Sequence, residues 1–292
     1  MYYLAYIPLY LLSLLPLPVL YLFGDGVYGL LYYVFGYRRK VVMGNLQIAF
    51  PEKTEEERKK IAKEFYHNFV DTFIETLKFL SWTQKDMEKR FQSDLSGIEK
   101  AYESGKSIVL VGMHNFNWEY ANWALAKRLK YPWLGIYMPI GNKAFDKIIK
   151  DLRGKYGTIL LPATDFKKYY LKYLREKHVL GSAADQSPGK PSNANWTLFF
   201  GRPTAFVTGM EKGARVNDSA VVFGHFYKVK RGYYRIDTSF VTDNPRLMKP
   251  GELTKLYANF CEACIKEKPA NYLWSHRRWK HEYKPEYGAI IE

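Results

Sequence analysis

The sequence predicts an α/β protein with a mainly parallel central sheet flanked by helices, preceded by an N-terminal hydrophobic helical segment. Two observations predict this fold. Short apolar segments alternate with helix-like segments from residue 107 onward, and an uncharged stretch begins at residue 2. At 292 residues the chain can bury the core of one large domain with an appendage. We therefore divide it into an N-terminal segment, residues 1–40, and a main domain, residues 41–292.

The N-terminal segment has the composition of a membrane anchor. Residues 2–23 carry no charge over 22 positions, about the length that crosses a hydrocarbon core, and a second apolar stretch follows at 27–37. No basic residue precedes the first stretch and no small-residue cleavage site ends it, which argues against a signal peptide. Its three prolines interrupt a straight helix, so the choice between crossing the bilayer and lying at its interface stays open.

The main domain begins with an amphipathic helix. Thr54 and Glu57 have capping-box spacing within residues 50–80, and a stripe lining a core follows at every fourth position: Ile61, Phe65, Phe69, Phe73 and Leu77. Strands are then expected at 107–113, 133–138, 158–161, 178–184, 219–229 and 233–240, and helices at 118–130, 143–156, 164–176, 204–216 and 252–267. Strands separated by helices imply a parallel sheet covered on both faces.

The charge balance indicates an anionic partner. Lys and Arg exceed Asp and Glu by 15, which fits nucleic acid or a phosphate-bearing membrane surface. The 25 Tyr and 7 Trp favour a membrane, because these residues concentrate in the headgroup layer. A basic cluster at 38–40 ends the anchor and, by the positive-inside rule, places the rest of the chain in the cytoplasm. The aromatic and basic segment 271–284 is expected to contact lipid phosphate, with single-stranded bases as the alternative.

Two cysteines and two histidines near the C-terminus imitate a metal site. Cys261, Cys264, His276 and His281 have a spacing close to that of a zinc finger. Both cysteines, however, lie on the apolar face of the helix expected at 252–267, where a thiol behaves as a small hydrophobic group. We therefore expect no metal, and with a cytoplasmic location no disulfide.

The stretch "GMHNFNWE" (112–119) is the strongest candidate for an active site. His114 follows the buried strand expected at 107–113, and Glu119 lies in the first turn of the next helix. A carboxylate facing the imidazole across that turn would keep one ring nitrogen protonated while the other accepts a proton. The pattern therefore predicts His114 as a general base with Glu119 as its partner.

Further polar residues are expected near this base. Asp185 and Gln186 follow the strand expected at 178–184 and should emerge at the same sheet edge as His114. Arg153 lies in the helix expected at 143–156, where it either holds phosphate or is an ordinary exposed helix charge.

The order and spacing of these motifs resemble those of the bacterial lipid A biosynthesis acyltransferases, the late acyltransferases related to lysophospholipid acyltransferases, and most of all the branch found in Bacteroidetes-like bacteria. The resemblance runs nearly end to end. It rests on residues 36–78, on the H-x4-E motif from His114 to Glu119, on "NKAFDKIIKDLRGKYG" (142–157), "ADQSP" (184–188), "FFG" (199–201) and "YLWSHRRWK" (272–280).

The resemblance implies a glycerolipid acyltransferase-like fold and an enzyme at the cell inner membrane. It would move a fatty acyl group from acyl carrier protein to a hydroxyl of a phosphorylated lipid A precursor, without a cofactor or metal and with no nucleic-acid partner. By motif, His114 is the general base and Glu119 orients and charges it. Asn117, Arg153, Asp185 and Gln186 are the substrate-binding or structural polar groups nearby.

Two departures from the family pattern leave the acceptor open. Phe116 stands where related sequences often have Gly, and Met138 stands where many have a basic residue. Losing that cation removes a plausible phosphate contact. The alternatives are the same chemistry on an aminolipid, an aryl-polyene lipid or a lysophospholipid, and, more remotely, a membrane-associated nucleic-acid-binding protein, which the charge of +15 suggests.

Overall fold

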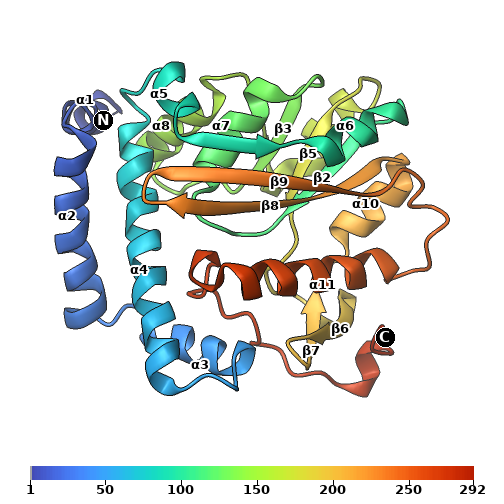
Figure 1. Cartoon of the computed structure of the whole chain (residues 1–292). Helices are drawn as coiled ribbons and strands as arrows, with labels where there is room; N and C mark the ends of the chain where they lie inside the picture. The colour runs from blue at the N-terminus through green and yellow to red at the C-terminus, as the bar shows by residue number, and fades with distance from the viewer. Residues whose placement is uncertain (1) are drawn as a thin grey trace.

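The computed structural model describes residues 2–292 and is built on a mainly parallel seven-stranded sheet (Figure 1). The strand order is β1-β9-β8-β2-β5-β3-β4, and every neighbouring pair is parallel except β8 and β9. The strands are β1 Phe91–Asp94, β2 Ile108–Gly112, β3 Trp133–Tyr137, β4 Ile159–Pro162, β5 Val179–Ala183, β8 Ala220–Lys230 and β9 Tyr233–Thr242. The predicted fold class is confirmed.

Helices cover both faces of this sheet. Alternate residues of β2 point to opposite sides: Val109 and Val111 pack in the core that holds α10 and α11, whereas Ile108 and Leu110 pack with α6 and α7. The helices are α1 Tyr2–Ser13, α2 Leu17–Gly29, α3 Arg39–Ala49, α4 Glu55–Lys78, α5 Gln84–Glu88, α6 Ser96–Glu103, α7 Trp118–Arg128, α8 Lys143–Gly154, α9 Phe166–Tyr170, α10 Gly209–Asn217 and α11 Glu252–Glu267.

Most of the predicted elements are present, and α11 has the predicted bounds. The start predicted for the helix at 204–216 is wrong, because residues up to Phe206 belong to β7 (Arg202–Phe206). This strand pairs with β6 (Asn195–Phe199) in an antiparallel hairpin. Phe200 and Gly201 between them both have positive φ, as a two-residue hairpin turn requires. The helix expected at 164–176 is also shorter, with α9 flanked by 3-10 turns. The elements α3, α5, β1, α6 and β6 were not expected.

The amphipathic helix is α4, and its capping box between Thr54 and Glu57 is confirmed. Its inward face differs from the predicted stripe: Phe65 is fully buried, but Phe73 is 56% exposed. The helix instead buries a polar row of Asn68, Asp71, Glu75 and Lys78. These side chains have partners on α2, β8 and β9, in the turn between β8 and β9, and in the loops before α2 and α7. Their burial therefore does not leave them unpaired.

The N-terminal segment forms two helices rather than one. The uncharged run breaks before Pro16, and α2 continues into a π-helical turn at Leu30–Val34. Among residues 2–292, Leu17–Val34 is the one helix long and apolar enough to cross a membrane. Figure 1 shows α2 running alongside α4, and Tyr28 and Tyr32 belong to the same core as Phe65. The two predicted domains therefore share a hydrophobic core.

Candidate active site

Two neighbouring strands end where the sequence predicts the site. The register pairs Gly112, the last residue of β2, with Ala183, the last residue of β5. His114 and Asp185 each lie two residues further on and meet at this sheet edge. The Nδ1 atom of His114 is 2.7 Å from Oδ1 of Asp185, and the same oxygen accepts the backbone N–H of His114 at 3.2 Å. The prediction that Asp185 emerges beside His114 is confirmed.

The surroundings of this pair favour its charged form. Burial by itself would raise the pKa of Asp185, but His114, through its charge and its hydrogen bonds, lowers that pKa below its usual value. Burial would likewise lower the pKa of His114, and the Asp185 carboxylate outweighs it and raises the pKa above 6.5. The His114 side chain is 32% exposed, and within residues 2–292 its Nε2 atom has no hydrogen-bond partner. The ring nitrogen opposite the buried carboxylate is therefore left without a protein partner on a partly exposed side chain.

Glu119 does not hold His114, so the predicted partner of the imidazole is wrong. Its carboxylate accepts hydrogen bonds from Nε and Nη2 of Arg153, at 3.0 Å and 2.6 Å, and from the indole N–H of Trp118 at 3.1 Å. The reason is helical geometry, because the first turn of α7 directs Glu119 toward α8 rather than back toward the end of β2. Burial would lower the pKa of Arg153, but the charge of Glu119 and its hydrogen bonds raise it.

The same contact decides between the two interpretations of Arg153. The guanidinium is not an ordinary exposed helix charge, since its side chain is largely buried and is paired with a buried carboxylate. It lies near the predicted site, on the side of α7 that faces α8. Two of its three nitrogens are occupied by Glu119.

Asn117 shapes the turn that carries this site. It is the N-cap of α7, with its Oδ1 accepting the backbone N–H of Glu119 at 3.0 Å. Its Nδ2 donates to Glu75 at 3.0 Å, and the residue is fully buried. The structure therefore gives Asn117 two protein partners and no surface for a substrate.

Glu75 supports the turn that carries the site and was not expected from the sequence. Its two carboxylate oxygens accept Asn117 and the phenols of Tyr21, at 2.6 Å, and Tyr234, at 2.7 Å. Burial raises its pKa, and the hydrogen bonds only partly oppose that rise. The available signal was the polar row at helical spacing in α4, starting at Asn68, which an exposed helix face also explains.

The C-terminal segment 271–284 closes the site from the other side. Leu273 donates its backbone N–H to the carbonyl of His114 at 3.1 Å, and Phe116 donates to the carbonyl of Asn271 at 3.1 Å. Tyr272, Trp274 and Arg278 of this segment are buried, so the expectation that the segment as a whole contacts lipid phosphate is wrong for them. These aromatic residues pack in the core instead of standing at a surface.

Contacts within the protein hold the turn that follows Asp185. Gln186 is partly buried beside Asp185, and Ser187 donates its backbone N–H to Nε2 of His276 at 3.0 Å. Burial lowers the pKa of His276 to about 4, which leaves that ring neutral. His281 contacts the carbonyl of Pro188. The two cysteines that completed the zinc-like pattern lie buried in α11, as their helical spacing predicts.

Comparisons with known proteins identify the family of this chain. The family model described as "Bacterial lipid A biosynthesis acyltransferase" matches residues 1–281. A lipid A biosynthesis lauroyltransferase of Escherichia coli (strain K12) is 28% identical over 278 residues, covering 93% of this chain and 89% of the relative. A lipid A biosynthesis acyltransferase of Haemophilus influenzae is 28% identical (91% and 86% covered), and a lipid A biosynthesis palmitoleoyltransferase of Escherichia coli (strain K12) is 23% identical (91% and 86%). With its family model matched over nearly the whole length, the chain belongs to the bacterial lipid A biosynthesis acyltransferases.

Proposed function

We propose that this protein transfers a fatty acyl chain from acyl carrier protein to a hydroxyl of a phosphorylated lipid A precursor, at the cytoplasmic side of the cell inner membrane. The observation that carries the chemistry is the His114–Asp185 pair, in which one ring nitrogen is held by a buried carboxylate and the other is open. The relatives that are named for transfer of acyl groups in lipid A biosynthesis support the acceptor.

In this mechanism Nε2 of His114 takes the proton of the acceptor hydroxyl as its oxygen attacks the thioester carbonyl. The C–S bond then breaks, and the imidazolium returns the proton to the sulfur that leaves with the carrier protein. Asp185 keeps Nδ1 protonated and stabilises the imidazolium. No covalent enzyme intermediate and no cofactor take part.

Glu119 has an indirect, positioning role in this proposal. Since its carboxylate is bound to Arg153, it positions α7 and the loop that carries His114 rather than touching the imidazole. Arg153 and Gln186 are the proposed contacts to the acceptor, and the net charge of +15 would favour a phosphorylated one.

The test is an acyl-transfer assay with the full-length protein in detergent. A labelled acyl chain on acyl carrier protein should appear on a tetra-acylated lipid A precursor, and a precursor without the free hydroxyls of its acyl chains should remain unlabelled. A lysophospholipid and an aminolipid are added to the same reaction as competing acceptors. They are included because the exposed Met138 stands where many related sequences have a basic residue that could contact phosphate. Transfer to one of these acceptors alone would replace the proposed substrate, and transfer to none of them would reject the function.

The pH dependence of kcat/KM should reveal the influence of Asp185. The rate is expected to fall as the pH drops through a value above 6.5, because a protonated His114 cannot accept a proton. Asp185→Asn removes the charge that raises this pKa, so the acid limb should move to lower pH while the plateau rate also falls. A profile measured between pH 5 and 9 checks this, and an unmoved acid limb in the variant would contradict the assignment.

A further inference from the structure

Arg278 is a buried cation that the proposed mechanism does not use. Among the lysines and arginines of residues 2–292 only Lys78 and Arg278 are buried, and Arg278 is 2% exposed. Its Nη1 donates to the carbonyl of Ala205 in β7 at 2.8 Å, whereas its Nε and Nη2 have no hydrogen-bond partner within the same residues. Because a guanidinium keeps its proton in a protein, the fold holds a positive charge here without a bonded counter-charge.

This charge lies next to the turn that carries Asp185. The hydroxyl of Ser187, two residues after Asp185, donates to the carbonyl of Arg278 at 2.6 Å. The guanidinium carbon is 4.2 Å from the ring centroid of Phe206, which belongs to the same core cluster as Ala184. Burial lowers the pKa of Arg278, and Tyr272 and the Asp185 carboxylate oppose that change. The charges of Arg278 and Asp185 therefore act on one another through the interior.

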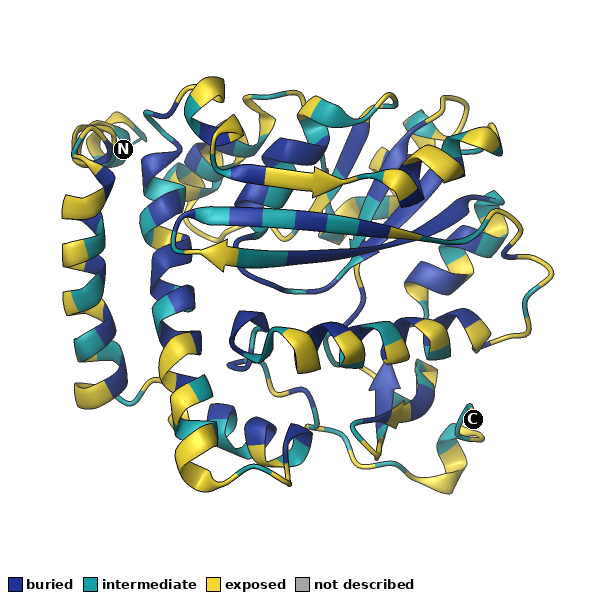
Figure 2. Cartoon of the chain, in the orientation of Figure 1, coloured by how far each residue is buried: buried dark blue, intermediate teal, exposed yellow. Residues whose placement is uncertain are grey.

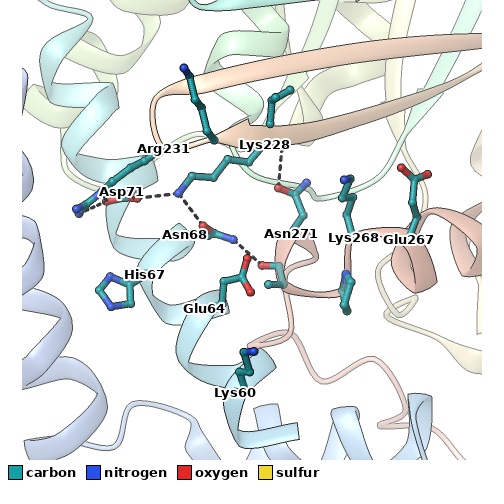
Figure 3. A pocket seen from close by; sticks show the side chains of 14 residues that line it. Lys60, Glu64, His67, Asn68, Asp71, Lys228, Arg231, Glu267, Lys268 and Asn271 are labelled. Carbon is teal, nitrogen blue, oxygen red and sulfur yellow. Dashed lines mark hydrogen bonds and ion pairs between the residues drawn. The ribbon is translucent and has the colours of Figure 1, made fainter. Parts of the chain in front are cut away.

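Two buried carboxylates of α4 show how this protein stabilises such groups. Asp71 accepts hydrogen bonds from two cations, Lys228 at 2.9 Å and Arg231 at 2.7 Å, beside a cavity of about 640 Å³ (Figure 3). Glu75 instead accepts hydrogen bonds from three neutral donors. Each arrangement offsets the free-energy cost of burying a carboxylate.

The stabilisation of Asp185 depends on the protonation state of His114. The carboxylate is 1% exposed, and its hydrogen bonds come from the ring and the backbone N–H of His114. When His114 acts as a base its ring is neutral, so the pair then carries a net negative charge in the interior. A buried charge of this kind is costly unless another charge compensates it.

The other titratable side chains around Asp185 are neutral. They come from α11, along which buried and exposed positions alternate (Figure 2), and from the C-terminal segment. Burial raises the pKa values of three of them, Tyr257, Cys261 and Tyr272, and lowers that of His276 to about 4. Between pH 5 and 9 these four side chains carry no charge. Within residues 2–292, Arg278 is therefore the buried cation available to compensate Asp185.

We propose that Arg278 is a positioning residue of the active site, whose buried positive charge keeps Asp185 ionised while His114 is a neutral base. It acts through Asp185 and does not touch the reacting atoms. The ionised carboxylate holds the proton on Nδ1 of His114 and so leaves Nε2 as the proton acceptor. The inference rests on the proposed function, because it adds a residue to the same catalytic pair.

The rate at which diethyl pyrocarbonate modifies His114 tests this proposal with the full-length protein in detergent. Only the neutral imidazole attacks the reagent, so the pH of half-maximal rate reports proton binding to the His114–Asp185 pair. Mass spectrometry of the peptide that contains His114 gives this rate between pH 5 and 9. In Arg278→Met the midpoint should rise by about half a pH unit or more, because the positive charge that opposes proton binding is gone.

Lys78→Met is the matched control, because it removes the other buried cation, which is bonded to the carbonyls of Ser13 and Leu15. Its midpoint should equal that of the unsubstituted protein. A midpoint that stays in place in Arg278→Met, or that moves equally in Lys78→Met, would overturn the proposal.

Urea unfolding tests the same coupling without any titration. Arg278→Met should cost less unfolding free energy in the Asp185→Asn protein than in the unsubstituted one, because no buried carboxylate is then left without its counter-charge. If Arg278→Met alone does not fold, adding Asp185→Asn should restore folding. An equal or larger cost in the Asp185→Asn protein, or a double variant that also fails to fold, would contradict the coupling.

Chemical modification needs no acyl transfer, so the two proposals can fail separately. A raised midpoint in Arg278→Met, together with no acyl transfer by the unsubstituted protein, would reject the proposed function alone. Full acyl transfer by the unsubstituted protein, together with an unmoved midpoint in Arg278→Met, would reject the role of Arg278 alone.

Discussion

His114→Ala is expected to lower kcat for acyl transfer by about a hundred- to ten-thousand-fold, because the acceptor hydroxyl loses its general base. The substitution also leaves the Asp185 carboxylate, whose side chain is 1% exposed, without its imidazole partner, so the rate is compared per folded molecule. Single-turnover transfer from labelled acyl carrier protein, measured with acceptor in excess, gives the rate without a contribution from product release.

The matched control is His281→Gln, which changes a second imidazole in the C-terminal segment without touching the His114–Asp185 pair. It should keep kcat within a few-fold of the unsubstituted protein. If His114→Ala retained a tenth or more of the rate while the control behaved normally, another group would have to be the base.

Glu119→Ala should destabilise the protein by about 3–5 kcal/mol, the cost of leaving a buried charge without its partner. Arg153 would then keep its guanidinium in a largely buried position with its three hydrogen bonds to Glu119 lost. Urea unfolding of the variant in detergent, followed by tryptophan fluorescence, measures the change in the free energy of unfolding.

A double-mutant cycle separates this explanation from a direct catalytic role. Arg153→Ala should also lower the free energy of unfolding. The double variant should lose clearly less unfolding free energy than the two single variants lose together, because it leaves no buried charge without a partner. Activity of the double variant per folded molecule shows what remains of any direct contribution. Strictly additive unfolding free energies would contradict the buried pair.

The local parts of the site could be predicted from the sequence. A β-branched, uncharged run before His114 and a helical pattern after it are signals within a few residues of one another. The position of Asp185 followed as well, because strands of a parallel sheet present their carboxyl ends at one edge. These arguments need only the direction of the chain at each element.

The pairing of side chains could not be predicted in the same way. His114 and Asp185 are 71 residues apart, and their contact depends on β2 and β5 being neighbours, which spacing along the chain does not specify. Glu119 is close to His114 in sequence, yet the rotation of α7 turns it toward Arg153. The buried carboxylate of Glu75 was hidden for another reason: a polar row on a helix is usually solvated, and only the packing of α2 and β9 reveals that it is not.

The bond from Tyr21 to Glu75 has a practical consequence for anyone preparing a soluble form of this enzyme. Cutting the chain after residue 40 would remove Tyr21 and Asp25 and so take hydrogen-bonding partners from Glu75 and Arg231. It would also uncover Val70 and Ile74, which now pack around Gly24. Truncation would remove the apolar outer face of α2 but would expose core residues of α4 to solvent. Polar substitution on the exposed side of α2 is therefore the better route to a soluble form.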